Sequence, residues 1–115
     1  MNVKAAHEAL LEAARNNTTI AYGDLIQIGE IDPAGKMGSD AISGALGRLL
    51  YDIVHAELAQ NPKAPMLSAI ALPKHGNEPA EGFYVLAEGL GRYQTGEDKM
   101  AFWVKELNAC YAYWD

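Results

Sequence analysis

Residues 39–58 have the sequence SDAISGALGRLLYDIVHAEL, and this stretch decides the fold prediction. Its apolar residues recur with the 3.6-residue period of an α-helix over roughly five turns. Ser39 or Asp40 can cap the start of this helix by accepting a hydrogen bond from a backbone N–H group of the first turn. The stretch therefore predicts a long helix with one apolar stripe, formed by Ile42, Leu46, Leu49, Leu50, Ile53, Val54 and Leu58.

Two glycines, Gly44 and Gly47, lie inside this predicted helix. Each costs about 1 kcal/mol relative to alanine in a helix interior, so their presence needs a reason. One reason is close packing against another backbone. The other is close approach to a ligand or to a nucleic-acid backbone. The presence of glycine alone does not distinguish these two explanations.

On the N-terminal side of the long helix, the sequence predicts two helices and a short extended segment. Residues 2–15 place apolar side chains at helical spacing, with charged residues off that stripe. Residues 18–22 are partly β-branched and predict an extended lead-in to a short helix over residues 24–29. Residues 31–38 contain one proline and two glycines, which predict a loop.

On the C-terminal side, the sequence predicts two strands and a final helix. Residues 67–72 form an apolar run bounded by prolines, which predicts a strand. Turn-forming residues at 74–79 and aromatic, β-rich residues at 82–86 predict that this strand returns as a β-hairpin. Glu97 and Asp98 favour the start of a helix through their negative charge. The apolar stripe of that helix contains Met100, Trp103, Leu107, Tyr111 and Trp114.

The order of these elements predicts an α+β fold in one domain, residues 1–115. A helix, a short helix and a long helix followed by a β-hairpin form the winged-helix arrangement, in which the hairpin is the wing. The final helix is an addition to this small winged-helix-like domain of three helices and a β-hairpin wing. In DNA-binding winged-helix proteins, the third helix is the recognition helix.

Several short segments resemble the DNA-binding half of the O6-alkylguanine-DNA alkyltransferases and the alkyltransferase-like proteins. Residues 20–25 (IAYGDL) look like the family's Val-x-Tyr-Gly-x-Leu/Ile segment, which opens its second helix. Residues 46–50 (LGRLL) resemble the Val-Gly-x-Ala-Leu of its recognition helix. Pro65 stands where the proline of the Pro-Cys-His-Arg active site would stand, and Gly76 and residues 81–83 resemble the return after it. The resemblance covers residues 18–83 and implies a winged-helix DNA-binding scaffold.

The sequence departs from this family at the positions that carry its chemistry. Met66, Leu67 and Ser68 follow Pro65 in place of Cys, His and Arg, so the alkyl-acceptor thiol and its activating histidine are absent. This excludes alkyl transfer by the family's mechanism. Gly44 takes the place of the arginine that fills the base stack after base flipping. The resemblance therefore implies a scaffold, and a scaffold alone does not give a function.

The charge balance bears on the choice of partner. The chain has 15 acidic and 9 basic residues, so its net charge is −6, which opposes binding to phosphate-rich nucleic acid or to an anionic membrane. Residues 78–115 hold seven acidic and three basic residues, so the C-terminal part is the more negative. Some polar and basic residues nevertheless fall where a winged helix faces DNA. The candidate nucleic-acid residues are Tyr22, Lys36, Arg48 and Lys74.

The motifs of common catalytic, metal and cofactor sites are missing from the sequence. The single cysteine, Cys110, lies in an apolar stretch and is expected in the core. The three histidines lack metal-ligand spacing, and the glycine-rich stretches fit neither a phosphate loop nor a dinucleotide fingerprint. We therefore expect no metal, no cofactor and no enzymatic activity. The remaining enzyme alternative is a site assembled from residues distant in sequence.

These observations predict a non-catalytic, acidic binding protein, most simply a small regulator or inhibitor that docks on a protein partner which handles nucleic acid. Aromatic residues on more than one face of the final helix suggest the docking surface, which could also serve a homodimer. The alternative is a winged-helix DNA-binding protein that has lost alkyltransferase chemistry. Because no signal peptide or membrane span is visible, we expect a cytoplasmic location and no membrane partner. The candidate partner-binding residues are Glu97, Asp98, Trp103, Tyr111 and Trp114.

Overall fold

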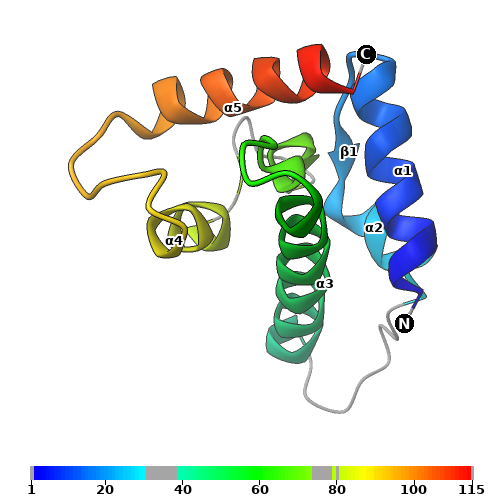
Figure 1. Cartoon of the computed structure of the whole chain (residues 1–115). Coiled ribbons are helices and arrows are strands. Elements are labelled where there is room, and N and C mark those ends of the chain that lie inside the picture. The colour runs from blue at the N-terminus through cyan, green and yellow to red at the C-terminus, as the bar shows by residue number, and fades with distance from the viewer. Residues whose placement is uncertain (1, 31–38, 74–78, 80, 115) are drawn as a thin grey trace.

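The computed structural model describes residues 2–30, 39–73, 79 and 81–114, except for the side chains of residues 39–44. Helices dominate it, and two short strands form a small parallel sheet. Figure 1 shows helix α1 on one side of the molecule and helix α4 on the other, with helix α3 between them. The elements are α1 (Val3–Arg15), β1 (Ile20–Ala21), α2 (Tyr22–Ile28), α3 (Ser39–Gln60), the 3₁₀ helix η1 (Leu67–Ile70), β2 (Ala71–Leu72), α4 (Glu81–Gly89) and α5 (Lys99–Tyr113).

The four predicted helices are confirmed as α1, α2, α3 and α5. Helix α1 begins at Asn2, whose side-chain oxygen accepts a hydrogen bond from the backbone N–H of Ala5. The side chains of His7 and Glu57 share a hydrogen bond that joins α1 to α3. The predicted apolar stripes of α1 and α3 face the core, where the fully buried members include Ala6, Leu10, Leu49, Ile53 and Val54.

The small sheet joins two parts of the chain that are far apart in sequence. Strand β1 pairs with β2 in parallel, with Ile20 opposite Ala71 and Ala21 opposite Leu72. Parallel strands need a long crossover connection, and the chain between residues 21 and 71 supplies it with α2 and α3. This pairing places the N-terminal end of α2 beside the segment that follows α3.

The predicted β-hairpin is wrong in both of its strands. Residues 82–86 belong to α4, and residues 67–70 form η1, so only Ala71 and Leu72 of the first predicted strand are in a sheet. Burial of Phe83, Tyr84 and Ala87 follows a helical face, and these aromatic rings pack on Tyr93 and Phe102. Packing against this aromatic cluster outweighs the β-propensity of the segment. The predicted turn at 74–79 lies outside the described residues, apart from Pro79.

Residues 64–72, which we call the central segment, form the middle of the fold. Every residue from Ala64 to Ala71 is buried, although Pro65 and the short η1 leave the segment without a long run of regular structure. Buried backbone N–H and C=O groups need hydrogen-bond partners. Helix α5, which lies across this segment in Figure 1, supplies partners for three of them.

Three side chains of α5 bind the backbone of the central segment. The Glu106 carboxylate accepts a hydrogen bond from the N–H of Met66 at 3.0 Å, and the Cys110 thiol donates to the C=O of Met66 at 3.2 Å. The indole Nε1–H of Trp103 donates to the C=O of Ala69 at 2.9 Å. These three residues are all buried. We call this set of contacts the α5 clamp.

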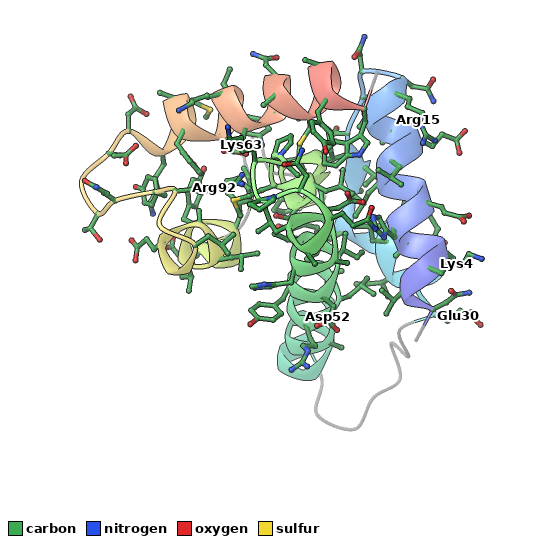
Figure 2. All side chains as sticks on the ribbon, viewed as in Figure 1. Lys4, Arg15, Glu30, Asp52, Lys63 and Arg92 are labelled. Atoms are coloured by element: carbon green, nitrogen blue, oxygen red, sulfur yellow. The ribbon has the colours of Figure 1, made fainter. Side chains whose placement is uncertain are left out.

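Arg92 completes the α5 clamp by balancing the charge of Glu106. Its guanidinium lies 3.7 Å from the Glu106 carboxylate and donates a hydrogen bond to the C=O of Pro62 at 3.1 Å. Figure 2 shows Arg92 beside α5. A buried carboxylate is tolerated when it is paired and hydrogen-bonded, and both conditions hold for Glu106.

We predict that replacing Glu106 by alanine lowers the free energy of unfolding by about 2–3 kcal/mol, because the buried N–H of Met66 loses its acceptor and Arg92 loses its counterion. Glu106→Gln keeps an acceptor oxygen and should lose less. Urea denaturation of both variants measures the difference. The exposed Glu12 on α1 provides the control, since E12A should change the stability by less than about 0.5 kcal/mol. An equal effect of E106A and E12A would contradict the role of the α5 clamp.

The Cys110 thiol should make stability depend on pH in the alkaline range. Burial raises the pKa of this thiol well above its ordinary value of 9.0, and the Glu106 carboxylate raises it further. Above about pH 9 the unfolded chain loses the thiol proton whereas the folded chain keeps it, so the free energy of unfolding falls as the pH rises. Denaturation at pH 8 and pH 10 should show a smaller fall for Cys110→Ala than for the wild type. Identical falls would contradict this prediction.

Candidate binding cleft

A cleft of about 600 Å³ opens between α3 and α4. Its volume lies within the range of about 300–1,000 Å³ that is usual for binding sites. The central segment and the start of α2 also contribute to its lining. The cleft is lined by Tyr22, Leu46, Gly47, Leu50, Tyr51, His55, Ser68, Gly82, Phe83, Val85, Leu86, Gly89 and Leu90.

The fold brings together residues from four elements to form this cleft. One face of α3 contributes Leu46, Gly47, Leu50 and Tyr51, because residues four apart in a helix share a face. Tyr22 is the first residue of α2 and reaches the cleft because β1, directly before it, pairs with β2. Ser68 reaches the cleft from the central segment, which the α5 clamp holds in place.

The polar groups of the cleft are few, and one of them is unsatisfied. Ser68 is only 3% exposed, and its Oγ has no hydrogen-bond partner among the described residues. Most buried polar side-chain atoms in proteins have a partner. The His55 ring lies against the Tyr51 ring with 4.1 Å between their centroids. The unpartnered hydroxyl of Ser68 is therefore a group that a bound ligand could satisfy.

Three glycines line the cleft where a side chain would reduce its volume. A Cβ atom added at Gly47, Gly82 or Gly89 would meet no atom within 4 Å. Close packing against another backbone therefore does not explain Gly47, while approach of a ligand agrees with its position. The surroundings of Gly44, the other glycine inside the predicted long helix, lie outside the described part of the structure.

Apolar side chains are exposed on both walls of the cleft. Val85 on α4 is 60% exposed and Tyr51 on α3 is 46% exposed. None of the described residues that line the cleft is a lysine, arginine, aspartate or glutamate. On α4, Glu81 is paired with Lys99 at 2.8 Å, and Glu88 accepts a hydrogen bond from the Thr95 hydroxyl at 3.0 Å. The described mouth of the cleft is thus apolar.

The five residues predicted to bind a partner do not form one exposed surface. Trp103 is 8% exposed and belongs to the α5 clamp, so the expectation of an exposed indole is not met. Tyr111 and Trp114 are half-buried and pack against the core. Burial raises the pKa of the Tyr111 hydroxyl, and the neighbouring Cys110 raises it further. Asp98 caps α5 through the N–H of Ala101, and Glu97 accepts a hydrogen bond from the N–H of Gln94.

The four residues predicted to bind nucleic acid are only partly placed by the structure. Tyr22 lines the cleft, and Arg48 is exposed on α3. Asp52, labelled on α3 in Figure 2, accepts a hydrogen bond from Arg48 at 3.1 Å and neutralises its charge. Lys36 and Lys74 lie outside the described residues. Lys4 and Arg15, on α1, lie on the far side of the molecule from α4 (Figure 2).

The described part of the chain offers no group of three or more His, Cys, Asp or Glu residues that could hold a metal ion. Ser68 and His55 both line the cleft, yet the Ser68 hydroxyl makes no hydrogen bond to a base. A nucleophilic serine is normally activated by such a bond. Within the same residues, no helix has the length and apolar character needed to cross a membrane.

No protein-family model matches this chain, and no curated protein or solved structure is significantly similar to it. The resemblance of residues 18–83 to the alkyltransferase family therefore stays a prediction.

Sequence reasoning missed the α4 wall of the cleft because it assigned residues 82–86 to a strand. It also gave no role to Ser68, which it noted only as a departure from the family's active site. Two signals were present in the sequence. Gly47 interrupts a strong helix, and Ser68 is a polar residue within the apolar run of residues 67–72.

We predict that Gly47→Ala raises the free energy of unfolding by about 0.5–1 kcal/mol, because alanine has the higher helix propensity and its Cβ enters open space. Gly91→Ala should instead destabilise the fold, since Gly91 has a φ of 76° that favours glycine. Thermal denaturation of both variants compares these effects. A destabilised Gly47→Ala would show that this position is packed and not part of an open cleft.

Proposed function

We propose that this protein is a non-catalytic binding protein that captures a protein partner in the α3–α4 cleft. One observation carries the proposal: the cleft is concave and apolar, and glycines keep it open at three positions where larger residues would fit. Gly47 lies well inside α3, where it lowers helix stability by about 1 kcal/mol relative to alanine. A loss of stability at such a position is typical of a functional site.

The exposed rim favours a macromolecular partner over a small molecule. Val85 and Tyr51 remain substantially exposed on opposite walls, so an occupant confined to the interior would leave them in water. A protein surface can fill the cleft with one side chain and cover the rim with its neighbours. Central anchors surrounded by contacts that exclude water are the usual arrangement of protein interfaces.

The charge distribution favours a basic partner. The net charge is −6, and the described residues that line the cleft include no lysine or arginine that would repel a basic partner. Complementary charge steers association and selects among partners. Proteins that handle nucleic acid have basic surfaces, which supports a small cytoplasmic regulator or inhibitor of such a protein.

The alternatives have less support from the described residues. The helix order α1, α2 and α3 agrees with a winged-helix scaffold, but α4 stands where the wing was predicted. The Arg48 side chain, which a DNA-binding scaffold would direct to phosphates, is paired with Asp52. Catalysis by Ser68 would require a base, and its hydroxyl has no hydrogen bond to one.

Val85→Arg tests the proposed function, because it places a positive charge at the rim while leaving the core intact. Peptides selected on the wild-type protein from a phage-displayed random library should combine an apolar or aromatic residue with lysine or arginine. Their affinity for V85R should fall by about tenfold or more, which corresponds to 1.4 kcal/mol. Fluorescence anisotropy with the selected peptides measures the change.

Val104→Arg is the matched control, since Val104 is an exposed valine on α5 that does not line the cleft. Peptide affinity for V104R should stay within about twofold of wild type, a change of less than 0.5 kcal/mol. Equal losses in both variants, or no selected peptides at all, would contradict capture in the cleft. Salt-sensitive binding of duplex DNA that is lost in Arg48→Glu would favour the winged-helix alternative.

A further inference from the structure

We infer that the partner's anchor in the α3–α4 cleft is an aromatic side chain with a hydrogen-bonding group, a tyrosine or a tryptophan, and that this group binds the Ser68 hydroxyl. This inference rests on the proposed function and specifies its recognition chemistry. Three observations carry it: the unpartnered Ser68 hydroxyl, the aromatic lining of the cleft and the absence of charged residues from the described part of that lining.

The Ser68 hydroxyl stands out because polar groups close to it in the chain are satisfied. The α5 clamp binds the N–H and C=O of Met66 and the C=O of Ala69. Ser68 lies between these two residues, is as buried as they are, and has an Oγ with no partner in the described chain. Ala69 and Ala71 show that alanine is accepted in this segment. A serine at position 68 therefore makes sense as a group that binds something the free protein lacks.

The lining of the cleft favours an aromatic ring. Tyr22, Tyr51, His55 and Phe83 contribute rings from α2, α3 and α4. Aromatic rings pack favourably on one another in edge-to-face or offset arrangements. The volume of about 600 Å³ accommodates a large side chain together with part of its neighbours.

Other anchors fit this chemistry less well. A leucine or phenylalanine would leave the already buried Ser68 hydroxyl without a partner, so it would gain no hydrogen bond from this group. A lysine, arginine or carboxylate would enter a cleft whose described lining offers no opposite charge. Tyrosine and tryptophan combine a large apolar ring with one polar group, which is the combination that this cleft can satisfy.

Two pairs of small probes test the anchor. p-Cresol and toluene differ only in the phenol hydroxyl, and 3-methylindole and 1,3-dimethylindole differ in the indole N–H. Titration of the full chain, followed by the NMR chemical shifts of cleft residues such as Gly47 and Gly82, gives each affinity. The wild type should bind the polar member of each pair about tenfold more tightly. Ser68→Ala should reduce that ratio to near one, and toluene should bind it as well as or better than it binds wild type.

Ser68→Cys is the second variant, because a thiol has similar size and is a weaker hydrogen-bond donor. It should give an intermediate ratio while preserving the fold. The inference is overturned if the wild type and S68A show the same preference, if toluene binds the wild type as tightly as p-cresol, or if neither pair shifts the cleft residues.

A pair of peptides identifies the source of the ring. The peptide acetyl-Lys-Tyr-Lys-amide should bind the wild type more tightly than acetyl-Lys-Phe-Lys-amide. The two peptides should bind S68A with equal affinity. If V85R weakens the selected peptides but no probe prefers Ser68, the proposed function stands and the aromatic anchor is wrong. If p-cresol depends on Ser68 but no peptide binds, the site takes a small phenol, and both capture of a protein and its anchor are wrong. Binding of duplex DNA in place of either peptide would also overturn the inference.

Discussion

The contact on which the rest of the structure depends is the α5 clamp on the central segment. A buried stretch with little regular structure can exist only if its backbone polar groups find partners. Glu106, Cys110 and Trp103 supply partners for three of those groups from one helix, and Arg92 balances the buried charge of Glu106. The pairing of β2 with β1 covers the C-terminal end of the segment, and the α5 clamp holds the part before it. The α5 clamp also sets the position of the neighbouring Ser68.

The α5 clamp and the cleft are two sides of the same segment. Met66 and Ala69 contact α5, while Ser68 lines the cleft between α3 and α4. The sheet pair of Ile20 and Ala71 then brings the start of α2 to the same place. The cleft is therefore built on a rigid, buried support, which is the setting in which a single unsatisfied hydroxyl can select a ligand.

The glycine at position 29 indicated the end of the short helix α2. Helical periodicity predicted α1, α3 and α5, although α5 buries Phe102, Trp103 and Cys110 and leaves the predicted Met100 43% exposed. It failed for α4, where Phe83 and Tyr84 have strand-like propensity but pack as one face of a helix against Tyr93 and Phe102. That contact joins residues distant in sequence, so no local pattern reveals it. The sequence likewise could not show that the Trp103 indole donates a hydrogen bond to the C=O of Ala69, so Trp103 was predicted to bind a partner. The choice at Gly47 between packing and ligand access likewise needed three-dimensional neighbours.

The two-residue sheet has a kinetic consequence. Residues 20 and 71 are far apart in the sequence, and α2 and α3 lie between them. Because contacts between distant residues form slowly, we expect this pairing to form late in folding. During synthesis, the central segment emerges before α5, which begins at Lys99. Until α5 arrives, an apolar run with unpaired backbone groups is exposed to water and to other chains. We therefore expect this protein to be most prone to aggregate between the synthesis of residue 72 and that of Cys110, the last residue of the α5 clamp.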